Sequence, residues 1–168
     1  MRVTLVLGAG GVTGGAFHAG LLAALAERGW DPSDADLIVG TSAGAITGTM
    51  LRAGLPAVDL LARVTGGPYT PTGERMLGGL GPPPAPPRLG RLRRPGVSTA
   101  AMRDLVDGIV GGTWPDRPLW IVAVRATTGR RTVFGRVGSP PATPGTAAAA
   151  SAAVPGLFRP VSVDGAPH

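Results

Sequence analysis

The N-terminal third of the chain twice repeats a short apolar run followed by a longer stretch with helical spacing. Residues 2–7 and 36–40 are rich in β-branched and aliphatic side chains, and each run predicts a buried strand. Residues 16–28 and 43–53 place their apolar side chains at the i, i+3 and i+4 positions, which predicts two helices. Two consecutive strand–helix units predict a parallel sheet covered by helices.

The rest of the chain predicts further helices and strands. The helix expected after Ser98 or Thr99, either of which is a candidate cap, presents Met102, Leu105, Val106 and Ile109 on one face. The other expected elements are a helix over 57–64, a strand over 119–126, its antiparallel partner over 131–136, a loop over 140–146, a helix over 147–153 and a last short strand over 161–163.

One long segment, residues 66–96, breaks both patterns. It contains the densest run of prolines, over residues 82–87, and a basic cluster formed by Arg88, Arg91, Arg93 and Arg94. Because proline fixes φ and removes a backbone donor, we expect no packed element in this segment. Two interpretations are open: a solvated, partly polyproline linker, or a mobile flap whose arginines make transient contact with anionic head groups at a membrane surface.

Composition limits the classes of protein that fit this pattern. With 168 residues and 43% hydrophobic side chains, the chain is expected to form a single domain over residues 1–168. The net charge of +6 comes from scattered arginines without any lysine, and aromatic residues are only 4%, so we expect no nucleic-acid partner. Cysteine is absent, which excludes disulfides, thiolate catalysis and cysteine-based zinc sites. No apolar run reaches the ~18 residues of a membrane span, and we expect a cytoplasmic protein with at most peripheral membrane contact.

A candidate nucleophile stands where the second expected strand meets the second expected helix. Residues 40–44 read Gly-Thr-Ser-Ala-Gly, a G-x-S-x-G pattern typical of a nucleophile elbow. In such a tight turn the residues flanking the serine lack side chains, which explains Gly40 and Gly44. The turn exposes the Ser42 hydroxyl at a helix N-terminus, where the dipole and free N–H groups favour negative charge. The alternative is that Ser42 only caps the helix.

The glycine-rich segment after the first strand supplies a second part of the candidate site. Residues 8–15 predict a loop with bare backbone, at the sheet edge where both parallel strands end. The N–H groups of Gly10, Gly11 and Val12 are therefore candidate donors to the oxyanion of an ester-hydrolysis intermediate. The alternative, a dinucleotide-binding turn, fits poorly because the glycine spacing misses G-x-G-x-x-G, and a chain without lysine has no P-loop.

Four stretches of the chain together resemble the patatin-like phospholipases. They are residues 5–25, the elbow 40–44, the turn 128–130 and residues 151–158. A glycine loop after the first strand combined with a G-T-S-A-G elbow after the second strand is far more specific than either motif alone. The resemblance implies a three-layer α/β/α fold with a mainly parallel central sheet. It also implies a serine acyl hydrolase that acts on lipid esters with a Ser–Asp dyad and needs no metal or cofactor.

The general base is the open part of this hypothesis. The chain has two histidines, His18 within the first expected helix and His168 at the last position, so a Ser-His-Asp triad has little support. Asp164-Gly165-Ala166 matches the D-G-[GA] motif in which the family carries its dyad aspartate, which makes Asp164 a candidate base. The same Asp-Gly dipeptide follows a short strand and is a strong signal for a hairpin turn.

The two interpretations of Asp164 imply different states of the protein. If Asp164 is the base, the chain holds the complete dyad of a phospholipase- or lysophospholipase-type acyl-ester hydrolase. If Asp164 is a turn residue, we expect the C-terminal end of the domain, with the catalytic aspartate, to be missing from this sequence. The alternative function is then a truncated fragment or pseudoenzyme that binds lipid without turnover.

Overall fold

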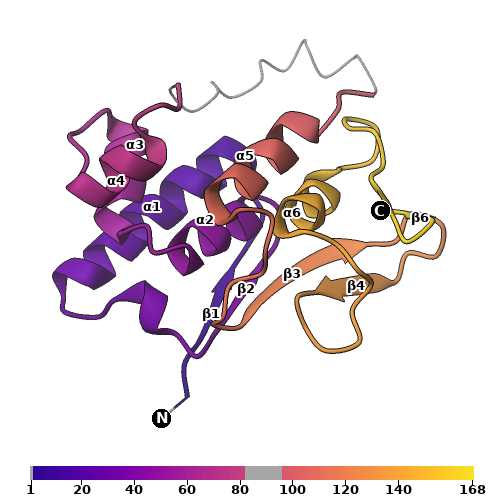
Figure 1. Cartoon of the computed structure of the whole chain (residues 1–168), viewed down its shortest axis with the longest axis horizontal. Helices are drawn as coiled ribbons and strands as arrows, with labels where there is room; N and C mark the ends of the chain where they lie inside the picture. Colours follow the sequence, from indigo (N-terminus) through magenta and orange to yellow (C-terminus); the bar gives the residue numbers. More distant parts are fainter. Residues whose placement is uncertain (1, 82–95) are drawn as a thin grey trace.

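A four-stranded sheet forms the centre of the chain, in a computed structural model that describes residues 2–81 and 96–168 (Figure 1). The strands, in their spatial order, are β1 (Thr4–Leu7), β2 (Leu37–Gly40), β3 (Leu119–Val124) and β4 (Arg131–Phe134). The first three strands are parallel, and β4 runs antiparallel to β3. The two strand–helix units and the later hairpin predicted from the sequence are therefore confirmed.

Helices connect these strands and cover the sheet. They are α1 (Gly11–Glu27), the 3₁₀ turn η1 (Pro32–Asp34), α2 (Ala43–Arg52), α3 (Ala57–Thr65), α4 (Pro71–Leu77), α5 (Ala100–Val110) and α6 (Pro144–Ala152). The predicted α/β fold class with a mainly parallel central sheet is confirmed, and the described residues form two of the three layers of an α/β/α arrangement (Figure 1). Within the described ranges, no helix is long and apolar enough to cross a bilayer.

The inner face of the sheet packs against the helices. It presents Leu7, Ile38, Leu119, Ile121 and Phe134, none more than 3% exposed. α2 approaches this face closely because its Gly48 has no side chain to collide with those of Ile38 and Leu119. α6 lies beside α2, against β3 (Figure 1).

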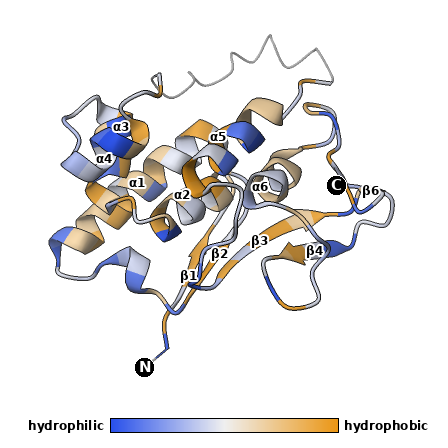
Figure 2. Ribbon diagram, in the orientation of Figure 1, coloured by the Kyte–Doolittle hydropathy of each residue, from blue (hydrophilic) through white to orange (hydrophobic). Residues whose placement is uncertain are grey.

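The outer face of the sheet carries apolar side chains that do not join this core. Side chains alternate along a strand, so the neighbours of the inner residues point to the opposite face. There Val6 is 70% exposed, and Val39, Trp120 and Val122 are half-buried and stand apart from the core cluster. Figure 2 shows the hydrophobic colour along β1, β2 and β3. The described residues thus supply the sheet and the helical layer on its inner face.

α1 begins earlier than the apolar spacing indicates. It starts at Gly11 instead of residue 16, with a first helical hydrogen bond from Gly14 N–H to the Gly10 carbonyl (2.9 Å). The prediction of a loop over residues 8–15 is therefore wrong beyond Gly10. The low helix propensity of glycine is outweighed here by the close packing of this first turn against the start of α2.

α6 also begins earlier than predicted. It starts at Pro144, inside the expected loop 140–146, because Thr143 caps it by accepting a hydrogen bond from the N–H of Thr146 (3.1 Å). Proline at the first helical position needs no N–H partner and already has a helical φ. At α5 the capping hydroxyl is that of Ser98, which accepts from the N–H of Ala100 (3.1 Å).

α4 contradicts the prediction that residues 66–96 contain no packed element. The fully buried carboxylate of Asp59 accepts hydrogen bonds from the Thr70 N–H (2.7 Å) and hydroxyl (2.6 Å). Thr70 in turn caps α4 by accepting from Gly73 N–H, and Leu77 at the end of the helix is buried. The sequence pattern missed this helix because it is short and is held by a single distant carboxylate.

The basic cluster of the same segment cannot be placed in this fold. Arg88, Arg91, Arg93 and Arg94 lie outside the described residues.

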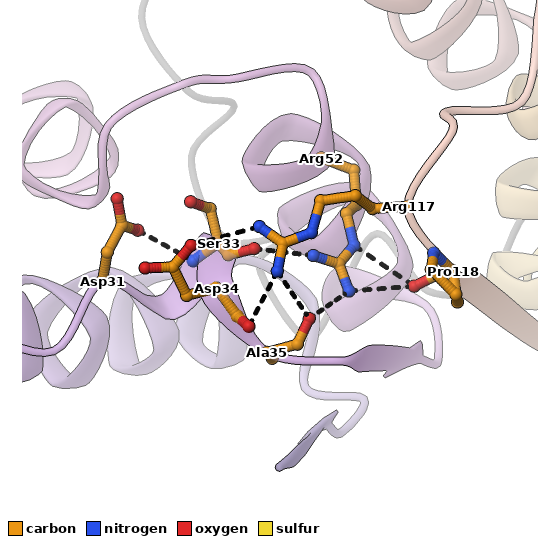
Figure 3. Close-up of polar contacts among 7 residues, drawn as sticks. All are labelled: Asp31, Ser33, Asp34, Ala35, Arg52, Arg117 and Pro118. Carbon is orange, nitrogen blue, oxygen red and sulfur yellow. Dashed lines mark hydrogen bonds and ion pairs between the residues drawn. The ribbon is translucent and has the colours of Figure 1, made fainter. Parts of the chain in front are cut away.

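Two arginines tie together the amino ends of the central strands (Figure 3). The Arg52 guanidinium donates to the carbonyl oxygens of Ala35 (2.8 Å) and Pro118 (3.0 Å), just before β2 and β3. Arg117 donates to the Asp34 carbonyl (2.8 Å) and pairs with its carboxylate (3.2 Å). Burial lowers the pKa of Arg52, and the neighbouring positive charge of Arg117 lowers it further. This edge of the sheet is structural, which leaves the opposite edge for function.

Candidate active site

Ser42 sits in a sharp turn between β2 and α2. β2 ends at Gly40 and α2 begins at Ala43, so only two residues connect strand and helix. Ser42 has φ 54° and ψ −115°, a conformation that side chains rarely adopt. The only other described residue with positive φ, glycines aside, is Asp164. The chain thus holds a strained serine at the carboxyl edge of the sheet, which is the geometry of a nucleophile elbow.

The two glycines around Ser42 stand where no side chain fits. A Cβ on Gly40 would lie 2.6 Å from the Cα of Ala45, and a Cβ on Gly44 would overlap the backbone of Leu7. The N–H of Thr41 also donates to the Leu7 carbonyl (3.0 Å). The elbow is therefore pressed against the end of β1, and glycine at both positions is a steric requirement.

The Ser42 hydroxyl has no structural task in this arrangement. Ser42 occupies the N-cap position of α2, yet its side chain makes no capping hydrogen bond. Within residues 2–81 and 96–168, no hydrogen bond to its Oγ is found, and the residue is partly exposed. The capping alternative thus lacks the hydrogen bond that defines it.

The backbone of Ser42 is held by Ser151, a residue to which the sequence motifs assign no role. The Ser42 N–H donates to the Oγ of Ser151 in α6 (2.8 Å), and the Ser151 hydroxyl donates to the Val122 carbonyl in β3 (2.5 Å). In the sequence, Ser151 is the lone hydroxyl within the alanine run 147–153. A single polar residue in an otherwise apolar buried helix was the available signal.

The candidate oxyanion donors lie at the N-terminus of α1. Gly10 is the N-cap, and Gly11 and Val12 open the helix, so their N–H groups precede the first helical hydrogen bond. α1 packs against the start of α2: a Cβ on Gly14 would lie 3.8 Å from the Cβ of Ala43. Two helix N-termini therefore converge at the elbow. Their free N–H groups and aligned dipoles favour an anion there.

Asp164 lies in a hairpin turn beyond the end of β3. It connects β5 (Ser162–Val163) to its antiparallel partner β6 (Ala166–Pro167), with φ 50° at Asp164 and 72° at Gly165. Two consecutive residues with positive φ define a type I′ turn, for which Asp-Gly is a preferred pair. The Asp164 side chain is exposed. The structure thus gives Asp164 the geometry of the turn interpretation.

Neither histidine is hydrogen-bonded to the elbow within the described residues. His18 is buried in α1, and burial lowers the pKa of its imidazole. The His168 ring lies 2.9 Å from the Thr132 hydroxyl and packs edge-on against Phe134. No hydrogen bond joins either ring to Ser42 within the described part of the chain, so the described residues assemble no Ser-His-Asp triad.

The two carboxylates that bridge helices are committed to backbone groups. Asp59 holds the start of α4, and Asp107 of α5 accepts from the Gly145 N–H (2.7 Å) and the Thr143 hydroxyl (2.8 Å) at the start of α6. Among the described residues, no carboxylate is hydrogen-bonded to Ser42. The part of the chain that the structure describes therefore brings the candidate nucleophile and the candidate oxyanion donors together, without a hydrogen-bonded base.

Comparisons with known proteins place this site in a family context. The family model described as patatin-like phospholipase matches residues 5–168. No curated protein matches the chain in sequence. Among solved structures, a chain of the heterodimeric ExoU–SpcU complex from the type III secretion system of Pseudomonas aeruginosa is similar, with a TM-score of 0.48 and 20% identity. The similarity covers 94% of the present chain and 37% of that chain.

Proposed function

The chain belongs to the patatin-like phospholipase family, whose members are generally lipid acyl hydrolases, and we propose that it hydrolyses acyl esters of lipids with Ser42 as nucleophile. One observation carries this proposal. A strained serine with an uncommitted hydroxyl stands at the N-terminus of α2, beside the free N–H groups that open α1.

The proposed reaction has two steps that share one oxyanion site. In the first, the Ser42 Oγ attacks the ester carbonyl carbon, a base takes the hydroxyl proton, and the lipid alcohol leaves with a proton. In the second, water attacks the resulting acyl-serine, which releases the fatty acid and restores the hydroxyl. The carbonyl oxygen becomes negative in each tetrahedral intermediate. The N–H groups of Gly10, Gly11 and Val12 are the proposed donors to it.

The proton acceptor in this proposal is a carboxylate, as in the family's Ser–Asp dyad. Asp164 is the candidate from the D-G-[GA] motif, and its hairpin lies at the carboxyl end of β3, since the N–H of Ala126 donates to the Pro167 carbonyl (2.8 Å). The type I′ geometry supports a turn role for Asp164. The dyad partner of Ser42 is then a different carboxylate from Asp164.

Lipid binding without turnover is the second candidate function. It is favoured by the lack of any base hydrogen-bonded to Ser42 among the described residues. Experiment can distinguish lipid hydrolysis from lipid binding without turnover. A reactive serine is labelled by a fluorophosphonate even where hydrolysis of the acyl-serine is slow, whereas ester turnover requires both steps.

Replacing Ser42 with alanine tests the nucleophile. We predict that the chain is labelled by a fluorophosphonate and releases p-nitrophenol from a short p-nitrophenyl ester, and that Ser42→Ala abolishes both signals because no acyl-serine forms. Ser98→Ala, which removes the exposed capping hydroxyl of α5, serves as control and should retain both signals.

Labelling that survives in Ser42→Ala would refute the assignment of the nucleophile. Labelling of the wild-type chain at Ser42 without ester turnover would favour lipid binding over hydrolysis.

A further inference from the structure

Ser151 links three elements around the elbow through one hydroxyl group. Its Oγ accepts the Ser42 N–H at 2.8 Å and donates its single proton to the Val122 carbonyl at 2.5 Å. A hydroxyl has one donor and two acceptor sites, so the proton is committed to β3 and a lone pair faces Ser42. This hydrogen-bonded chain therefore runs in one direction, from the elbow through α6 to the sheet.

The position of the Ser151 hydroxyl follows from the register of the parallel strands. The N–H of Ile38 donates to the Pro118 carbonyl (3.1 Å), and the ladder of β2 and β3 ends with Gly40 opposite Ile121. A parallel ladder repeats every second residue on each strand. Four residues further along both strands from the Ile38–Pro118 hydrogen bond, the same pattern would join the Ser42 N–H directly to the Val122 carbonyl.

Ser151 occupies this next position of the ladder. Its oxygen stands between the two backbone groups that would otherwise pair, so β2 leaves the sheet while both groups remain satisfied. The carbonyl group of Ser42 is held by α2, because the Ala45 N–H donates a hydrogen bond to it (2.9 Å). The backbone of Ser42 is therefore held on both sides, and its unusual φ and ψ are imposed from outside the turn.

We propose that Ser151 is a positioning residue, which holds the Ser42 backbone so that the hydroxyl points toward the oxyanion donors. The effect of Ser151 on the reactivity of Ser42 rests on the proposed function, whereas the hydrogen bond between the Ser42 N–H and the Ser151 Oγ does not. Ser151 takes no part in bond making, because its only proton is already donated to Val122.

Ser151→Ala tests both parts with two measurements. Without the hydroxyl, the Ser42 amide loses its acceptor, and we expect its hydrogen exchange, followed by NMR, to become at least about ten-fold faster. The maximal rate of fluorophosphonate labelling should fall by roughly 10- to 100-fold with unchanged inhibitor affinity, the size expected for a misplaced reacting group. Ser151→Thr keeps a hydroxyl on the same Cβ and should restore most of the rate.

Ser139→Ala is the matched control. The Ser139 hydroxyl also accepts a backbone N–H, that of Arg136 (3.1 Å), and its proton is shared between two carbonyls, those of Arg136 (2.6 Å) and of Val133 in β4 (2.8 Å). Ser139→Ala should lower the free energy of unfolding about as much as Ser151→Ala does, without slowing the fluorophosphonate labelling of Ser42. An equal loss of rate in this control would overturn the proposal, because a general loss of stability would then explain the effect.

The remaining outcomes are also decisive. A protected Ser42 amide and a wild-type labelling rate in Ser151→Ala would refute the positioning role. If Ser151→Ala does not fold, Ser151→Cys, with a weaker donor of similar size, takes its place under the same criteria. If the wild-type chain is not labelled, the proposed function fails, and exchange of the Ser42 amide alone decides whether Ser151 holds the elbow.

Discussion

Ser42 and Asp164 share positive φ for different reasons. Ser42 is forced into its conformation by contacts from α2, α6 and the end of β1, because its neighbours leave no other path between strand and helix. Asp164 adopts positive φ in an exposed two-residue turn, where Asp is locally favoured. Imposed strain at a serine points to function, whereas a locally favoured turn needs no functional explanation.

Substitution of Asp164 separates its turn role from chemistry. Asparagine tolerates positive φ as well as aspartate, so we predict that Asp164→Asn keeps the stability and the fluorophosphonate labelling rate within about two-fold of the wild type. Asp164→Ala should lower the free energy of unfolding by about 1 kcal/mol, because alanine disfavours the left-handed region. Urea unfolding and labelling kinetics measure the two effects.

A different result would assign Asp164 to the active site. If Asp164→Asn folds normally but loses turnover by about 100-fold or more, the carboxylate is the base, since removal of a general base costs that much.

α4 shows how a short helix depends on one distant side chain. Asp59 in α3 provides the acceptors for Thr70 at the start of α4, and Gly73 has no Cβ because the Asp59 carboxylate fills that space. A helix of seven residues has too few internal hydrogen bonds to persist alone. Tertiary contact therefore decides whether this segment is helical.

Removal of the Asp59 carboxylate should release α4. Asp59→Ala leaves the partly buried N–H and hydroxyl of Thr70 without their acceptor, and we predict a loss of about 1–3 kcal/mol in the free energy of unfolding. The loss should be accompanied by faster hydrogen exchange at the amide of Gly73. Arg75→Ala, an exposed change in the same helix, is the control and should stay within about 0.5 kcal/mol of the wild type. An unchanged Gly73 amide in Asp59→Ala would show that α4 is held by other contacts.

The two edges of the sheet have separate tasks. At the amino ends of the strands, Arg52 and Arg117 bind carbonyl groups and join η1, α2 and β3 into one unit (Figure 3). At the carboxyl ends, the N–H groups at the start of α1 and the Ser42 hydroxyl have no partner among the described residues, and these are the groups that we propose bind the substrate. This division follows the general preference of open α/β sheets to bind ligands beyond the carboxyl ends of their strands.

The two faces of the sheet should respond differently to mutation. Leu7 and Val6 are adjacent in β1, with exposures of 3% and 70%. We predict that Leu7→Ala lowers the free energy of unfolding by about 2–5 kcal/mol, because it opens a cavity under α2. Val6→Ala should change it by less than about 0.5 kcal/mol, as for other exposed positions. Urea unfolding of the two variants measures the contrast. Equal losses would show that the outer face is covered in solution.

Periodicity and local chemistry predict much of this protein. The apolar runs that become β1, β2 and β3, and the spacing of α2 and α3, follow from residues close together in the chain, as does the turn at Asp164. The elbow is equally local, because its G-x-S-x-G pattern is five consecutive residues and the strand and helix on either side of it are read from the adjoining sequence.

Contacts between distant residues decide the rest. The glycines at the start of α1 become helical only when packed against α2, α4 depends on Asp59, and the elbow depends on Ser151, which lies 109 residues further along the chain. Helix propensity and hydrophobic periodicity do not reveal these contacts. Each contact forms because one element leaves a backbone group or a space unfilled and a residue of another element fills it. The sequence alone therefore predicts that Ser42 stands in an elbow, whereas the tertiary structure shows how its N–H is held and which groups remain free beside it.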